Sequence, residues 1–129
     1  MLELRIAFLS LGALTNVAAS EPDKFDLQCI GTSNTSIDAQ KAPDVRWTET
    51  YRINLEEGSF CQKDCSLVQR VANVLPDRIE LSRSPILRLN RSNGQIISVS
   101  SSFESGHLTS IILSGSCEKA TFSGFPRKF

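Results

Sequence analysis

The 129-residue sequence has no excess of charge, because 14 Lys and Arg residues balance 14 Asp and Glu residues, and it has a single histidine. A balanced charge argues against a nucleic-acid-binding protein, whose phosphate contacts need a clustered basic surface, and against electrostatic docking on anionic lipid. The sequence also lacks the motif G-x-G-x-x-G and a P-loop, so it supports no nucleotide cofactor. The length excludes a large multi-domain enzyme and predicts one small domain.

No apolar stretch approaches the roughly 20 residues that a membrane-spanning helix needs. The most apolar block, Ile6–Leu14, follows a short head with one basic residue and precedes the small residues of the sequence VAAS. This arrangement is typical of a signal peptide with cleavage after Ala19 or Ser20. We therefore predict a signal peptide over residues 1–20 and a single soluble β-rich domain over residues 21–129.

Four cysteines, Cys29, Cys61, Cys65 and Cys117, all lie after the predicted cleavage site. An even number of cysteines in an exported chain predicts disulfides and an oxidising compartment. Three pairings are possible, and chain order favours Cys61 with Cys65, a local pair, and Cys29 with Cys117, which would join the first and last strands. In the chain-entropy model the long loop contributes roughly 4 to 5 kcal/mol and the short loop about 2 kcal/mol.

The alternative interpretation of Cys61-x-x-x-Cys65 is a metal or redox site. The spacing is not the C-x-x-C of thiol oxidoreductases, and neither a second such motif nor a histidine cluster accompanies it. We therefore expect no metal and no cofactor.

The clearest periodic pattern covers Arg46–Glu56, where Trp47, Tyr51, Ile53 and Leu55 alternate with polar residues. A period of two places these apolar side chains on one face, so the stretch predicts a half-buried strand. Further strands are predicted over Phe25–Thr32, Arg78–Ser84, Ile86–Arg91, Gln95–Ser101, His107–Ser114 and Ser116–Ser123. Their predicted inward residues are Phe25, Leu27, Cys29, Ile79, Leu81, Leu87, Leu89, Ile97 and Val99.

Turn residues separate these strands. Asn93-Gly94 predicts a hairpin with a type I′ turn, and Ser105-Gly106 predicts a second turn. Asn34–Pro43 is expected to be a polar loop. Gly124–Phe129 is expected to be a tail whose two aromatic residues can pack back onto the domain.

The period changes before Pro76, where Leu67, Val71 and Val74 or Leu75 follow the spacing of one helical face. Ser66 and Gln69 could form a capping box, and Pro76 would end the helix, although the apolar run also fits a strand. The expected fold class is therefore mainly β, a small disulfide-stapled antiparallel β-barrel or curved sheet of about six or seven strands with one short helix.

Catalytic chemistry has little support in the sequence. The one histidine, His107, lies in the turn sequence Glu104-Ser105-Gly106-His107, and serines are nearby, but a triad is defined by geometry. The carboxylates show no spacing that singles out a pair. We therefore assign no catalytic residue, and we treat Ser105, Gly106 and His107 as a candidate loop contact.

The segments FDLQCIGT, TYRINLEEGSFCQKDC, NRSNGQ and GSCEKATFSGFP resemble small exported bacterial proteins with four cysteines that carry no assigned activity. The chain also resembles the periplasmic C-type lysozyme inhibitors, which are small disulfide-bearing β-barrels with the inhibitory motif Ser-Gly-x-x-Tyr. Here Ser105-Gly106 is followed by Thr109 in place of the tyrosine, and the Thr-Lys pair of the second inhibitory motif has no counterpart.

These features predict an exported protein, periplasmic or secreted, that acts as a non-enzymatic binding module for a protein or small ligand of the cell envelope. The alternatives are a lysozyme-inhibitor-like protein and a small hydrolase that uses His107. We expect no nucleic-acid partner and no membrane span in the mature chain.

Overall fold

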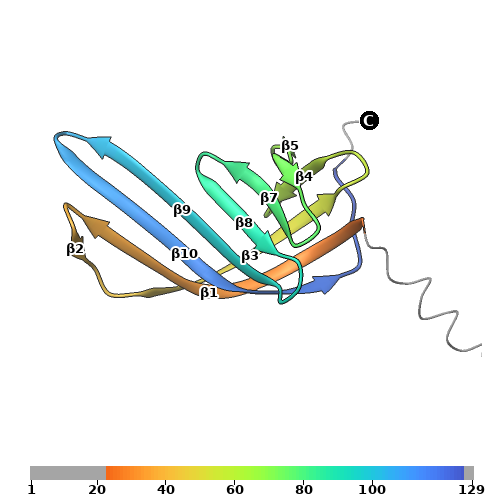
Figure 1. Cartoon of the computed structure of the whole chain (residues 1–129), viewed down its shortest axis with the longest axis horizontal. Helices are drawn as coiled ribbons and strands as arrows, with labels where there is room; N and C mark the ends of the chain where they lie inside the picture. The colour runs from red at the N-terminus through yellow and green to blue at the C-terminus, as the bar shows by residue number, and fades with distance from the viewer. Residues whose placement is uncertain (1–22, 127–129) are drawn as a thin grey trace, which may run out of the picture.

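The computed structural model describes residues 23–126, which form one antiparallel sheet that curls into a half-barrel (Figure 1). The predicted signal peptide lies outside the described residues. The strands are β1 (Lys24–Ile37), β2 (Gln40–Lys41), β3 (Val45–Asn54), β4 (Ser59–Gln62), β5 (Gln69–Arg70), β6 (Asn73–Val74), β7 (Arg78–Arg83), β8 (Ile86–Asn90), β9 (Gln95–Glu104) and β10 (His107–Ala120). The prediction of a mainly β fold with a curved sheet is confirmed, whereas the predicted number of strands, six or seven, is too low.

The order across the sheet is β5-β4-β3-β1-β10-β9-β8-β7-β6, and β2 pairs with the end of β1. The first and last long strands are therefore neighbours, with Cys29 directly opposite Cys117. The structure joins these two cysteines in one disulfide, with a Cα–Cα distance of 4.0 Å, and Cys61 with Cys65 in the other. Both pairings are those that chain order favoured.

Alternation along the strands places the core on the inner face of the curled sheet. Tyr51 and Ile53 are buried there, as the pattern in Arg46–Glu56 predicted. The other buried core residues are Phe25, Leu27, Cys29, Phe60, Ile79, Leu81, Leu87, Leu89 and Ile96. This core lies at only one end of the sheet, where β3, β4, β7 and β8 curl around it. We call this the curled end.

The other end of the sheet is an arm, which we define as the part of β1, β9 and β10 beyond the pair Gly31 and Gly115, together with β2. Figure 1 shows β9, β10 and the end of β1 running away from the curled end. The backbones of β1 and β10 pass close together at Gly31 and Gly115, which are directly paired. A Cβ added to Gly31 would lie only 2.5 Å from the Gly115 Cα. The arm carries the most exposed apolar side chain of β9, Phe103.

The predicted helix before Pro76 is wrong. Residues 69–74 instead pair with both edges of the sheet, through β5 on β4 and through β6 on β7. Between these strands the Val71 N–H donates to the Gly58 carbonyl, and the Ala72 N–H donates to the Glu80 carbonyl. A helix this short is marginal by itself, whereas the two edges offer partners for the backbone, so edge pairing prevails over the helical spacing.

The predicted polar loop over Asn34–Pro43 is also wrong. β1 continues to Ile37, and a tight turn at Asp38 and Ala39, both with positive φ, leads into β2. Neither face of the arm is covered by other described residues. Neither face therefore needs apolar side chains, and polar residues can continue the strand. The two strands predicted in residues 107–123 are one strand, β10, because Gly115 stays in the ladder opposite Gly31 and does not end the strand.

The predicted inward set of β9 is wrong as well. Leu89 of β8 pairs directly with Ile96, which is therefore buried, while Ile97 faces outward with 39% of its surface exposed. Since successive side chains alternate, this register places Val99 outward with Ile97. The turn at Asn93-Gly94 is present, but only Gly94 has a positive φ, so it is not a type I′ turn.

The tail after β10 crosses the outer face of the curled end. Asp26 accepts hydrogen bonds from the Ser123 N–H and hydroxyl, at 3.1 and 2.7 Å, and Arg52 donates to the Gly124 carbonyl at 2.8 Å. Phe122 and Phe125 make an edge-to-face contact with each other, with ring centroids 5.5 Å apart. The residues after 126 lie outside the described part of the chain.

Candidate functional site

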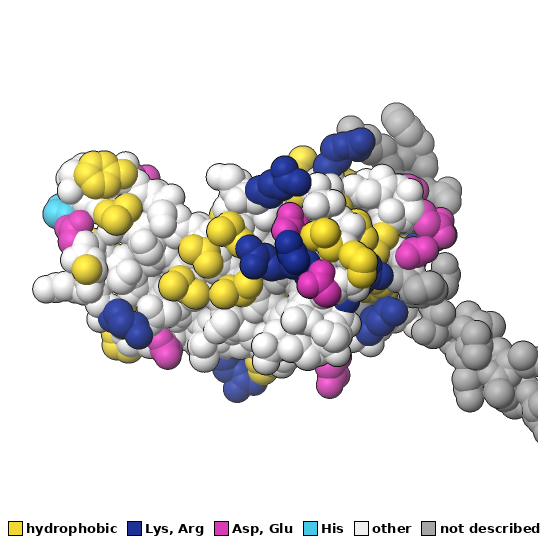
Figure 2. All heavy atoms as spheres, viewed as in Figure 1, with side chains coloured by type: hydrophobic (Ala, Val, Ile, Leu, Met, Phe, Trp, Pro, Cys, Tyr) yellow, Lys and Arg dark blue, Asp and Glu magenta, His cyan; other side chains and the backbone are white. Residues whose placement is uncertain are grey.

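The candidate loop contact lies at the tip of the arm. Ser105 and Gly106 form the turn between β9 and β10, both with positive φ, and His107 is the first residue of β10. All three residues are exposed. The single histidine (cyan) lies at the far end of the arm in Figure 2, next to acidic side chains.

Asp38 connects this tip to the turn between β1 and β2. Its carboxylate lies 2.6 Å from the His107 Nδ1 and accepts the Leu108 N–H at 2.9 Å. The Asp38 N–H in turn donates to the Leu108 carbonyl at 2.8 Å. The hydrogen bonds from His107 and then from the Leu108 N–H hold the pKa of the Asp38 carboxyl below its usual value. The two hairpin ends are therefore tied together by their polar groups.

This arrangement gives an oriented imidazole but no nucleophile beside it. His107 borders a shallow depression of about 570 Å³ that is lined by Thr35, Ile37 and Lys41, among others. Within residues 23–126, no hydrogen bond joins the His107 ring to a serine or threonine hydroxyl. The tip is an exposed turn that Asp38 fixes in place, and in the described part of the chain it does not have the geometry of a catalytic triad.

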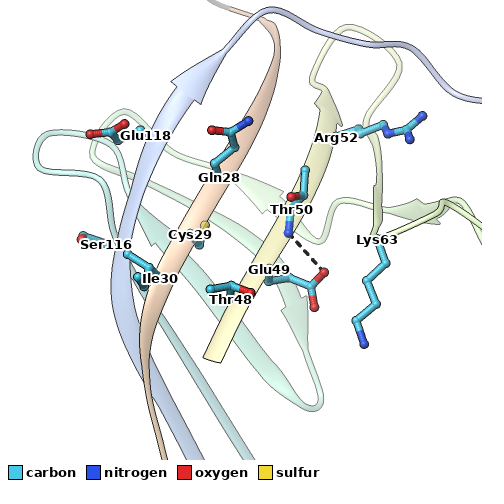
Figure 3. A pocket seen from close by; sticks show the side chains of 10 residues that line it. All are labelled: Gln28, Cys29, Ile30, Thr48, Glu49, Thr50, Arg52, Lys63, Ser116 and Glu118. Atoms are coloured by element: carbon cyan, nitrogen blue, oxygen red, sulfur yellow. Dashed lines mark hydrogen bonds between the residues drawn. The ribbon is translucent and has the colours of Figure 1, made fainter. Parts of the chain in front are cut away.

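A wide groove lies on the outer face of the sheet, across β3, β1 and β10 (Figure 3). It has a volume of about 880 Å³ and is open to solvent. Its floor consists of side chains that alternate with the core residues, namely Gln28 of β1, Thr48 and Thr50 of β3, and Ser116 of β10, and Ile30 of β1 borders it. None of these floor side chains titrates near neutral pH, so the groove floor offers contact chemistry and no acid or base.

Charged side chains border this groove. Glu49 accepts hydrogen bonds from the Thr50 N–H at 3.2 Å and from the Gln62 side chain at 3.4 Å. Arg52 is occupied by the Gly124 carbonyl of the tail. Lys63 reaches the groove from the loop after β4 in Figure 3. Glu49 and Arg52 are therefore held in place by neighbouring groups.

A second groove, of about 610 Å³, lies on the other side of Ile30. It is lined by Ile97 of β9, Arg88 of β8 and Ser114 of β10, among others. Ile30 borders both grooves, and 43% of its surface is exposed. Ile30 is therefore an apolar ridge between two depressions.

Apolar side chains continue from this ridge along the outer face. Ile112 of β10 is exposed, and it pairs with Val99 of β9, which pairs in turn with Ile86 of β8. We call Ile30, Ile86, Ile97, Val99 and Ile112 the outer apolar patch. Figure 2 shows hydrophobic side chains gathered over β8, β9 and β10, next to basic side chains.

Periodicity in the sequence does not reveal this patch, because it places Ile97 and Val99 in the core. The signal that could have revealed it is two runs of consecutive apolar residues, Ile96-Ile97 and Ile111-Ile112-Leu113. Consecutive apolar residues in a strand face opposite sides, so both faces must carry apolar surface.

Other chemistry has no assembled site in the described residues. Residues 23–126 contain no group of three or more His, Cys, Asp or Glu side chains that could hold a metal ion. No described segment forms a helix of the length and apolarity that crossing a membrane requires. Comparisons with family models, curated proteins and solved structures found no match to this chain.

Proposed function

We propose that this protein is an exported, non-enzymatic binding module, periplasmic or secreted, that holds a protein partner on its outer face around Ile30. The observation that carries the proposal is the exposed Ile30 ridge between two open grooves, next to other members of the outer apolar patch. Contiguous exposed apolar surface with a polar border is typical of protein-interaction sites. Two disulfides support an oxidising, extracytoplasmic location.

The shape of the grooves favours a protein over a small ligand. A small-molecule site encloses most of its ligand in a concave pocket. Both grooves here are open, and the Ile30 side chain between them is exposed, so a small molecule would keep much of its surface in water. A complementary protein surface could instead cover the ridge and both depressions together.

The test is a pull-down from envelope extract with the mature, disulfide-bonded protein as bait. We expect Ile30→Glu to lose the retained protein, because it places a charge at the centre of the apolar ridge. The matched control is Ile37→Glu, an identical change in the same strand on the opposite face, which should retain the partner. If the two variants retain the partner equally well, or if neither retains it, the result contradicts the proposed surface.

A second candidate function, lysozyme inhibition, is favoured by one observation, namely that Ser105-Gly106 protrudes at an exposed tip that Asp38 fixes in place. Purified protein should then suppress lysozyme activity at micromolar concentration. Asp38→Ala should weaken this inhibition because it releases the tip, whereas Ile30→Glu should not change it. No suppression at that concentration removes this candidate.

A further inference from the structure

The sheet has a free edge along the end of β9. β8 pairs with β9 only over Ile96–Val99, so Ser100–Glu104 pairs with β10 on one side alone within residues 23–126. Figure 1 shows the β9–β10 hairpin extending well past β8. Backbone N–H and C=O groups that face outward along such an edge are available to another strand.

The start of β3 is a second free edge, but it is protected by charge. β4 pairs with β3 only from Tyr51 onward, so Val45–Glu49 is unpaired on that side within the described chain. This stretch carries Arg46 and Glu49, and charged side chains on an edge strand discourage pairing with another chain. Ser100–Phe103 carries no charge and no proline, and the single charged residue of the β9 edge, Glu104, lies at its end next to the turn, so the β9 edge is less protected than the β3 edge.

We propose that two copies of this protein form a dimer by antiparallel pairing of Ser100–Glu104 with itself, with Ser102 on the two-fold axis. A two-fold interface requires a self-complementary surface, and this edge is one. Pairing about Ser102 places Glu104 opposite Ser100 of the second copy, so no like charges meet. The occupied edge at Val99 and the turn at Ser105 limit the shared ladder to this stretch, which gives about four to six backbone hydrogen bonds.

The side chains of this register also fit together. Phe103, of which 71% is exposed, would lie beside Ser101 of the second copy. Ser101 is small, and its hydroxyl lies 3.3 Å from that of Ser110 on the neighbouring strand, so the two serines form a low surface on which a ring can pack. Each Phe103 would thereby bury apolar surface that the single copy exposes.

This dimer is independent of the proposed function, because it uses the β9 edge and not the outer face around Ile30. The test is sedimentation of the mature, disulfide-bonded protein from micromolar to millimolar concentration, where we expect a concentration-dependent dimer. Ser102→Lys places two like charges together at the two-fold axis, so the dimer dissociation constant should rise about tenfold or more. The control Thr48→Lys adds the same charge to the β3 edge and should leave dimerisation unchanged.

A wild-type protein that stays monomeric at all these concentrations would overturn the proposal, and so would a dimer that persists in Ser102→Lys. Hydrogen exchange of the wild-type protein provides a measurement that needs no variant. The amides of residues 100–104 should gain protection as protein concentration rises, while those of residues 45–49 should not. Ile30→Glu should still dimerise, which separates this test from that of the partner surface.

Discussion

At the scale of single residues, the most constrained position is the pair Gly31 and Gly115. A Cβ on Gly31 would collide with the Ser114 carbonyl oxygen, and one on Gly115 would collide with the Ile30 carbonyl oxygen. These contacts are with backbone atoms, which cannot move without shifting β1 against β10. Glycine at both positions therefore allows the two longest strands to pass close together between the core and the arm.

We predict that Gly31→Ala lowers the free energy of unfolding by more than about 2 kcal/mol, because β1 and β10 must separate to admit the methyl group. Gly106→Ala is the comparison, since its Cβ would meet nothing within 4 Å and only the positive φ opposes it. That change should lower stability by about 1 kcal/mol. Urea unfolding of both variants measures the difference, and equal losses would contradict the close-approach explanation.

A second residue-scale prediction concerns Tyr51, the only tyrosine. Burial, and secondly the nearby Glu49 carboxylate, raise the pKa of its phenol well above the usual value near 10. The folded protein thus keeps a proton that the unfolded chain loses. The contribution of Tyr51 to the free energy of unfolding is complete below about pH 10 and is lost as the pH rises above that value. Tyr51→Phe should therefore be less sensitive than wild type to alkaline pH.

Urea unfolding at a series of pH values between 8 and about 11 tests this linkage. The other titrating groups are common to both proteins, so the difference between the two curves reports Tyr51. Parallel curves would show that the phenol titrates equally in the folded and unfolded chains.

At the scale of elements, strands that bury one face could be predicted from the sequence. Strands that bury neither face, or that carry apolar side chains on both faces, could not. Alternation identified the inward residues Tyr51 and Ile53 and the later strands β7 and β8. The arm is exposed on both faces, so its polar residues gave no periodic signal, and the extension of β1 to Ile37 was missed. The outer apolar patch was missed for a related reason, since register decides which of Ile96 and Ile97 is buried.

In residues 69–74, backbone pairing with the edges of β4 and β7 outweighs the helical spacing of the apolar side chains. We predict that Ala72→Pro lowers the free energy of unfolding by about 2 kcal/mol, because it removes the N–H that donates to the Glu80 carbonyl. Ala72→Val keeps this donor and should cost less than about 1 kcal/mol. If both variants unfold at the same urea concentration, the hydrogen bond to β7 does not stabilise the fold.

At the scale of the whole molecule, the two disulfides have different roles because they close loops of different length. Cys29–Cys117 spans 88 residues and joins the strands at the centre of the sheet, whereas Cys61–Cys65 spans 4 residues beside the short strand β4. A long closed loop restricts the unfolded chain more than a short one does. The long disulfide therefore limits how far the two halves of the half-barrel can separate in the unfolded state.

We predict that replacing both Cys29 and Cys117 by alanine lowers the free energy of unfolding by about 4 kcal/mol, within a typical total of roughly 5 to 15 kcal/mol. The same replacement at Cys61 and Cys65 should cost about 2 kcal/mol. Denaturation without reductant measures both variants. If the mechanism is restriction of the unfolded chain, the long-loop variant should also unfold with a larger dependence on urea concentration, because its unfolded state exposes more surface. A larger loss from the short loop would instead show that strain or packing around the cysteines decides their contribution.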